Sequence, residues 1–257
     1  MSILFNDIVF GPIHSRRLGS SLGINLMPKF GKFCTFDCIY CECGWNKDGK
    51  SDSHIPTYEE VESAMRTKFV KLAEEGTNID TITFSGNGEP TVHPDFPRII
   101  DTTIELRNRY FPRAAISVLS NATQIGKESV REALKKVTNP ILKIDSALEE
   151  YVRIIDNPYS GYSLEKTLGY LKEFDGNFIL QTMFLKGEIN GRTIDCTSKE
   201  LTEPWIRMVL DLRPREVMMY TIDRETPASS LEKVTVEEMQ SIASELIKNG
   251  INVQIRG

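Results

Sequence analysis

The chain has 257 residues, 40% of them hydrophobic and 26% charged, with a formal net charge of -5. This mixture is typical of a globular domain with its own core, and it argues against broad nucleic-acid binding, which usually requires a basic excess. No apolar run approaches the ~20 residues that span a bilayer, and the first residues lack the charged-then-apolar pattern of a signal peptide. We therefore expect a cytoplasmic protein.

Short β-type runs alternate with helical stretches along the whole chain. The first predicted strand covers 23–28, and Thr57 with Glu60 forms a predicted capping box before the first helix. Further strands are predicted at 80–85, 114–119, 141–144, 178–185, 216–222 and 252–255. The predicted helices cover 58–75, 96–109, 127–136, 164–174, 199–212 and 236–249.

This alternation predicts a parallel sheet, because strands joined through helical crossovers pair in parallel. Roughly six such units fit either an open doubly wound sheet or an incomplete barrel. In both architectures the functional site lies at the carboxyl ends of the strands. The motifs described next follow strand ends, which agrees with that placement.

Three cysteines lie close together in the run Cys34-Thr35-Phe36-Asp37-Cys38-Ile39-Tyr40-Cys41. Three thiolates on one loop can hold three irons of a cubane cluster, which normally has four cysteine ligands, so one iron stays open to a small molecule. Zinc is the alternative, since Cys43 could complete a tetrahedral set. In a reducing compartment such crowding indicates metal binding rather than disulfides.

Several later strand ends carry residues suited to ligand binding. The turn Ser85-Gly86-Asn87-Gly88-Glu89-Pro90 allows close backbone approach and offers carbonyl acceptors for an ammonium group, although Asn-Gly alone also explains a tight turn. Ser120, Asn121 and Asp145 end the next strands and could bind a ligand or cap the turns that follow. Gln181 lies on one face of a strand, and Tyr220 lies near the end of another.

The cysteine loop, with an aromatic residue before its third cysteine, resembles the signature of the radical S-adenosylmethionine (SAM) superfamily. The resemblance implies a single α/β domain over 1–257, folded as an incomplete (β/α)6 TIM-like barrel. Residues 1–22 would then be an N-terminal extension over the barrel mouth, and 224–257 a C-terminal helix and short strand. It also implies a [4Fe-4S] cluster on Cys34, Cys38 and Cys41, with SAM on the open iron.

The turn after the second strand is similar to the family's Gly-Gly-Glu segment, which holds the SAM amino group. Here Asn87 stands between the two glycines, so Gly88 and Glu89 would carry that role. The resemblance implies the following cofactor-binding residues: Tyr40, Gly86, Asn87, Gly88, Glu89, Ser120, Asn121, Asp145, Gln181 and Tyr220.

The run Gly11-Pro12-Ile13-His14-Ser15-Arg16-Arg17-Leu18-Gly19 resembles a branch related to the wyosine-base synthases, which act on a tRNA guanine. Arg16 and Arg17 suit a carboxylate or phosphate on a substrate, and a solvated basic pair is the alternative. Cys43 and Cys196 are too few for a second four-cysteine cluster.

The resemblance implies an enzyme with oxidoreductase or lyase chemistry that cleaves SAM reductively and starts a 5′-deoxyadenosyl-radical reaction. A flavodoxin or ferredoxin would supply the electron. The substrate is not specified: an RNA base, a partner protein activated by glycyl-radical formation, and a small carboxylated or phosphorylated metabolite all fit. The alternative from another class is a non-catalytic metal-binding or electron-transfer protein.

Overall fold

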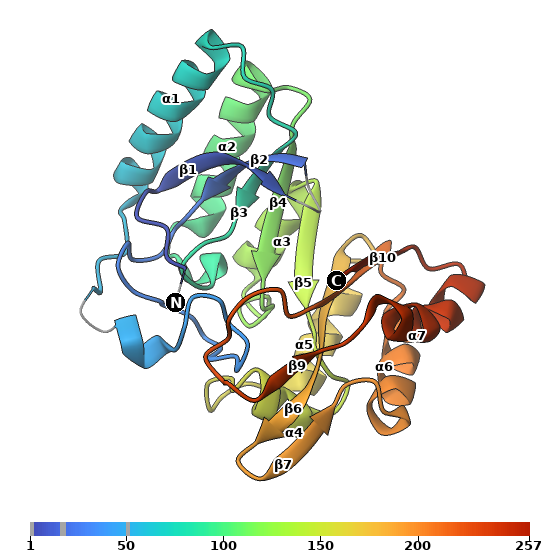
Figure 1. Ribbon diagram of the computed structural model, residues 1–257. Helices are drawn as coiled ribbons and strands as arrows, with labels where there is room; N and C mark the ends of the chain where they lie inside the picture. The colour runs from blue at the N-terminus through green and yellow to red at the C-terminus, as the bar shows by residue number, and fades with distance from the viewer. Residues whose placement is uncertain (1–2, 16–18, 50–51) are drawn as a thin grey trace.

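The computed structural model describes residues 3–15, 19–49 and 52–257, and its centre is a curved sheet (Figure 1). The main path of the sheet follows chain order: β1 (Val9–Ser15), β2 (Gly19–Ile24), β3 (Thr81–Phe84), β4 (Ala115–Ser120), β5 (Asn139–Lys143), β6 (Ile179–Ile189), β8 (Glu216–Thr221) and β10 (Val253–Arg256).

Neighbouring strands from β2 to β10 are parallel, and only β1 on this path is antiparallel to its neighbour. A doubly wound sheet reverses its strand order at a switch point, whereas this path does not reverse. Within the described residues β1 and β10 do not pair, so the barrel stays open. The incomplete TIM-like barrel predicted for this single α/β domain is therefore confirmed.

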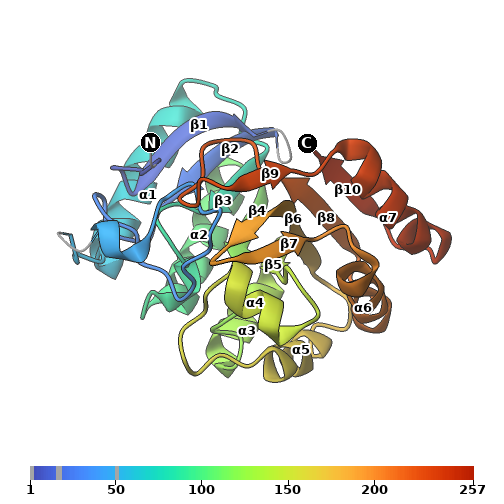
Figure 2. The ribbon, with the colours of Figure 1, turned by 60° about the horizontal axis from the view of Figure 1, so that its bottom comes forward.

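Helices cover the outer side of the sheet (Figure 2). The predicted helices are all present within two residues of their expected ends: α1 (Tyr58–Glu74), α2 (Phe96–Tyr110), α3 (Glu128–Lys136), α5 (Leu164–Lys172), α6 (Lys199–Leu212) and α7 (Val236–Lys248). The capping box of Thr57 and Glu60 forms as predicted. No helix of the described segments is long and apolar enough to cross a membrane.

Several short elements were not predicted. They are β1, β7 (Arg192–Asp195), β9 (Leu231–Lys233), α4 (Glu149–Ile155) and the 3-10 turns η1 (Asn46–Gly49) and η2 (Pro90–Val92). Gly11 and Pro12 hid β1, since both residue types are depleted in strands, but Pro is tolerated on an edge strand. Consequently the N-terminal segment contributes an edge strand to the sheet.

The strand predicted at 23–28 lies instead at Gly19–Ile24. The side chain of Asn25 ends it: Oδ1 accepts from the backbone N–H of Met27 at 3.1 Å, and Nδ2 donates to the carbonyl of Phe5 at 3.1 Å. Such local side-chain bonds compete with the strand ladder. The chain therefore leaves the sheet four residues earlier than the apolar run suggests.

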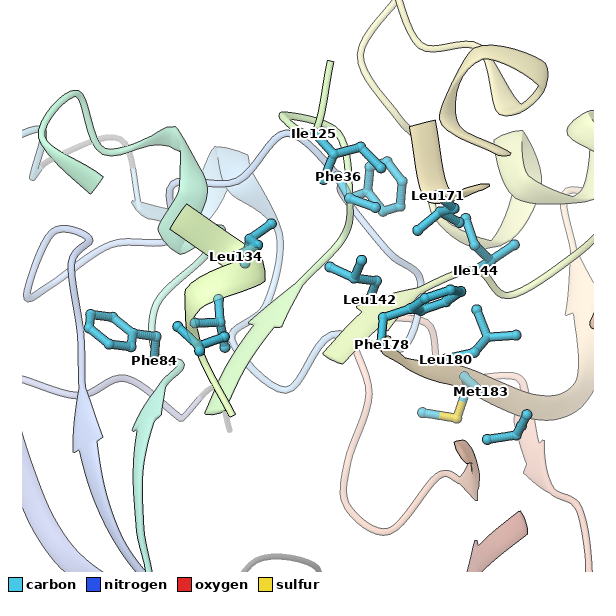
Figure 3. Close-up of a cluster of buried hydrophobic side chains, with 14 of the residues drawn as sticks. Phe36, Phe84, Ile125, Leu134, Leu142, Ile144, Leu171, Phe178, Leu180 and Met183 are labelled. Atoms are coloured by element: carbon cyan, nitrogen blue, oxygen red, sulfur yellow. The ribbon is translucent and has the colours of Figure 1, made fainter. Parts of the chain in front are cut away.

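The main core lies between the sheet and its helices. Phe84 of β3 and Phe96 of α2 are both 0% exposed and meet edge to face, with ring centroids 6.2 Å apart. Phe36 of the cysteine loop belongs to the same core and lies among Ile125 and Leu171 (Figure 3). The loop is therefore anchored by its own apolar side chain.

The opposite, inner face of the strands carries a second, smaller cluster formed by Ile141, Ile179 and Met218. Because side chains alternate along a strand, Lys143 and Gln181 lie on this same face, two residues nearer the carboxyl ends. The inner face thus changes from apolar to polar toward the end of the barrel where a site is expected.

We expect Phe96→Ala to lower the free energy of unfolding by about 3–5 kcal/mol, since it removes a fully buried ring from the core. Phe30→Ala is the matched control, because Phe30 is 62% exposed and should cost less than about 0.5 kcal/mol. Urea unfolding followed by circular dichroism measures both. Equal losses for the two variants would contradict this account of the core.

Candidate functional site

The cysteine loop lies against the carboxyl ends of the parallel strands and is held by backbone bonds on two sides. On one side Phe33 N–H donates to the carbonyl of Asn87 at 2.8 Å, and Glu89 N–H donates to the carbonyl of Phe33 at 3.2 Å. On the other side Ile39 N–H donates to the carbonyl of Ile155, the last residue of α4, at 3.0 Å. The loop is thus fixed between the Gly86–Pro90 turn and α4.

The sulfur atoms of Cys34 and Cys38 receive hydrogen bonds from the surrounding protein. The backbone N–H of Phe36 and the side-chain amide of Asn121 each donate to Cys34 Sγ at 3.5 Å. The ammonium of Lys143 lies 3.5 Å from Cys38 Sγ. Donors of this kind stabilise ligating thiolates and adjust the reduction potential of an iron–sulfur cluster.

The pKa values of the cysteines differ along the loop. Burial raises the pKa of Cys34 to about 12 and holds that of Cys38 well above its usual range. A hydrogen bond with Cys43 lowers the pKa of Cys41 to about 6. The thiolate is the form that binds metal, and coordination deprotonates even a buried thiol outright.

Lys32 is a site residue that sequence reasoning missed. Its ammonium is buried, donates to Asp37 Oδ1 and to the carbonyl of Gly44, both at 3.0 Å, and lies near all three loop cysteines. Burial alone would lower the pKa of Lys32, but the charges of the three thiolates and Asp37 outweigh burial and raise it. Lys32 therefore supplies a fixed positive charge beside the thiols.

The Gly86–Pro90 turn brings the backbone close to this loop. Gly88 has φ +152°, and a Cβ there would collide with the carbonyl of Phe33. The carbonyl of Gly86 accepts a hydrogen bond from Cys43 Sγ at 3.3 Å, so this acceptor faces the cysteine loop. The two glycines therefore lie beside the cysteine loop.

The side chain of Asn87, which was predicted to contact a cofactor, points away from the loop. It is 0% exposed, donates to the carbonyl of Pro28 at 2.7 Å and exchanges two bonds with the backbone of Phe5. An amide that fills its bonds within the chain ties the N-terminal segment to the turn. The cofactor contact of Asn87 stays a prediction.

Glu89, Ser120 and Asn121 come together but mainly bind one another. The buried carboxylate of Glu89 accepts from Ser120 Oγ at 2.8 Å, from Asn121 N–H at 2.6 Å and from Thr91. Burial raises the pKa of Glu89, and these hydrogen bonds oppose the rise. The three predicted residues join the ends of β3 and β4 to Cys34.

A buried ionic cluster lies beneath the loop, formed by Lys143, Asp145, Asp156 and Tyr40. The Lys143 ammonium lies 2.8 Å from Asp145 Oδ2 and also contacts Asp156 and the hydroxyl of Tyr40. Burial alone would lower the pKa of Lys143, but the two carboxylates raise it well above its usual value. Burial and the charge of Asp145 raise the pKa of Asp156 to about 7.

Asp145 was predicted as a possible ligand contact, but its oxygens serve the protein. Oδ1 accepts from Met183 N–H at 3.0 Å, and Oδ2 binds Lys143 and the hydroxyl of Tyr40. Sequence reasoning missed Lys143 and Asp156. The one sequence signal for Lys143 was its position directly after the apolar run 140–142 of a buried strand, because burying an unpaired charge there would be energetically unfavourable.

Gln181 and Tyr220 line a cavity of about 250 Å³ together with Tyr40 and Cys41. A larger hollow of about 610 Å³ adjoins it and shares Cys41 and Arg224. The segment after β8 borders both: Arg224 pairs with Glu42 at 2.7 Å, and Ala228 N–H donates to the carbonyl of Ile39 at 3.1 Å. The part of this segment beyond Arg224 was not predicted as part of the site.

Two further points concern the predicted substrate contacts and the predicted metal site. Arg16 and Arg17, predicted as substrate contacts, lie outside the described residues. In the part of the chain that is described, no three His, Cys, Asp or Glu side chains are grouped as ligands of a single metal ion.

A family model described as Radical SAM superfamily matches residues 29–195, more than half of the chain, so the chain belongs to this superfamily. Two curated relatives are a protein named GTPase Obg of Brachyspira hyodysenteriae, 29% identical over 236 residues, and a UPF0026 protein of Methanocaldococcus jannaschii, 30% identical over 242 residues. These alignments cover 90% and 91% of this chain, but 32% and 70% of the two relatives.

The fold also matches a solved structure, Streptococcus suis SuiB bound to S-adenosylmethionine. The TM-score is 0.64 at 14% identity, over 88% of this chain and 49% of SuiB. The superfamily's cofactors are a [4Fe-4S] cluster and SAM. The donor set fits the cluster: three thiols on one anchored loop, N–H donors aimed at two of the sulfurs, and a buried ammonium that balances thiolate charge.

We expect Gly88→Ala to detach the loop from the turn, because the new Cβ meets the carbonyl of Phe33. Gly191→Ala is the control: its φ is +77°, but open space surrounds it, so it should cost only the backbone strain of about 1–3 kcal/mol. Thermal unfolding should show a larger loss for Gly88→Ala. A loss no larger than that of the control would contradict the close contact.

We expect Lys143→Met to lower the free energy of unfolding by about 3–5 kcal/mol, since it leaves two buried carboxylates unpaired. Lys135→Met is the control, because Lys135 pairs with Glu132 on the surface of α3 and should contribute less than about 1 kcal/mol. Denaturant unfolding compares them. Adding Asp156→Asn to Lys143→Met should restore part of the loss.

Proposed function

We propose that this chain is a radical SAM enzyme in which Cys34, Cys38 and Cys41 hold the [4Fe-4S] cluster. The observation that carries the proposal is the anchoring of the cysteine loop at the carboxyl ends of the strands, against the Gly86–Pro90 turn. In a parallel (β/α) barrel this is the end where active sites lie. The bound cluster and SAM together supply a 5′-deoxyadenosyl radical by reductive cleavage of SAM.

We propose different roles for the predicted cofactor residues, depending on which of their hydrogen-bonding groups are already used within the protein. The carbonyl of Gly86, which already accepts from Cys43, offers an acceptor for the SAM ammonium beside Gly88. Tyr40 and Tyr220 face the cavity and offer aromatic contacts. Glu89, Ser120, Asn121 and Asp145 are positioning residues, because their side chains are bonded within the protein.

Two buried lysines support the same proposal. Lys32 lies near all three thiols, and Lys143 lies against Cys38. Positive charge beside a cluster favours its reduced form, because reduction adds negative charge. A flavodoxin or ferredoxin supplies the electron. The reaction is hydrogen-atom abstraction from a C–H bond. Within the superfamily, the sequence run Gly11–Gly19 favours the wyosine-related branch.

Anaerobic reconstitution tests the proposal. We expect about four irons and four sulfides per chain, a spectral change on adding SAM, and 5′-deoxyadenosine after reduction with dithionite. Cys38→Ala should lose the cluster absorbance and 5′-deoxyadenosine production. Cys196→Ala is the control, since this buried cysteine lies outside the loop, and it should keep both.

Cys43→Ala separates the cluster from a zinc site. With a cluster on three cysteines, this variant should keep its iron and sulfide, whereas a zinc site that uses Cys43 as fourth ligand would lose metal. One zinc per chain without sulfide in the wild-type protein would contradict the proposal and favour a non-catalytic metal-binding protein.

A further inference from the structure

The inner face of the last strands carries polar side chains in two neighbouring rows. One row across β6, β8 and β10 consists of Gln181, Met218 and Gln254, and the next row consists of Met183, Tyr220 and Arg256. Paired residues of parallel strands point to the same face. Gln181, Met183, Tyr220 and Arg256 accordingly line the same cavity of about 250 Å³.

The Gln181 side chain lacks the partners that a buried amide normally has. Gln181 is 6% exposed, and its side chain makes no hydrogen bond within the described residues. Gln254 Oε1 also has no partner there, but Gln254 is not among the residues that line the cavity. Nearly all buried polar groups in folded proteins are satisfied, so the Gln181 amide at the cavity wall indicates a ligand that completes it.

Arg256 adds an unpaired positive charge at the same cavity. Its guanidinium donates to the carbonyl of Ile255 at 3.4 Å, and no carboxylate of the described residues lies within ion-pair distance. The other charged side chains at the cavity already have partners. Arg224 pairs with Glu42 at 2.7 Å, and Asp223 lies 3.7 Å from the ammonium of Lys233.

We propose that Arg256 binds a carboxylate or phosphate of a small-molecule substrate, and that Gln181 binds an amide-like hydrogen-bonding edge of the same molecule. The proposal rests on the proposed function, because it names the substrate class of that site. A planar guanidinium fork matches both anions. The net charge of -5 and the small cavity favour a small molecule over an RNA.

This assignment changes the predicted role of Gln181 from cofactor contact to substrate contact. Tyr40 and Cys41 of the cysteine loop line one side of the cavity. Arg256 comes from β10, at the far edge of the sheet. A substrate held by β6 and β10 therefore faces the cysteine loop across the cavity.

The test is calorimetric titration of the reconstituted protein, in the presence of SAM, with inorganic phosphate and separately with acetate. We expect saturable binding of one anion and at least tenfold weaker binding to Arg256→Met. Arg113→Met is the control, because Arg113 is an exposed arginine before β4 at the opposite end of the strands, and it should bind as the wild type does. The anion that binds more tightly identifies the substrate group.

In this titration the inference is overturned by no anion binding to the wild type, by equal binding to Arg256→Met, or by a single-stranded RNA oligonucleotide that binds where neither small anion does. The SAM-induced spectral change separates this inference from the proposed function. Its absence in the wild type counts against the enzyme itself. Its loss in Arg256→Met alone would make Arg256 a SAM contact and also overturn the inference.

Discussion

The ammonium of Lys143 holds together the segments on which the candidate site depends. It joins Asp145 after β5, Asp156 at the end of α4, and Tyr40 and Cys38 of the cysteine loop. Buried charges are tolerated when they are paired and hydrogen-bonded, and are strongly destabilising when one partner is removed. The position of the loop is therefore coupled to the integrity of this cluster. A loop that carries metal ligands gains a defined geometry from charges lying beneath it.

On its opposite side, the loop is held by a close backbone contact and by hydrogen bonds rather than by ion pairs. Gly88 allows the backbone to touch Phe33, and Glu89 gathers Ser120 and Asn121 at the ends of the strands. Several residues that the sequence marks as ligand contacts thus serve to hold others in place. Enzymes that depend on a reactive cofactor commonly use the protein for orientation and exclusion of water rather than for chemical steps. The bonding pattern at this site agrees with that division.

Periodicity predicted the helices and most parallel strands, because each of those elements buries one continuous face. It missed β1, β7 and β9, which are short, lie at edges, or contain Gly and Pro. Spacing predicted the cysteine loop and the glycine turn, whose chemistry is local. Lys32, Lys143, Asp156 and Arg256 were missed, because their roles arise from neighbours distant in the chain. The engagement of Asn87 with Phe5 is likewise a tertiary contact that no local pattern contains.

The open barrel separates two tasks along one sheet. Strands β2 to β5 and the cysteine loop carry most of the groups assigned to the cofactors, whereas the cavity groups assigned to the substrate, Gln181 and Arg256, lie on β6 and β10. With this arrangement, substitutions on β10 can alter what the cavity accepts without disturbing the buried lysines or the loop. Because the barrel is open, substrate selectivity can diverge in evolution through changes on the edge strand, while the groups assigned to the cofactors stay the same.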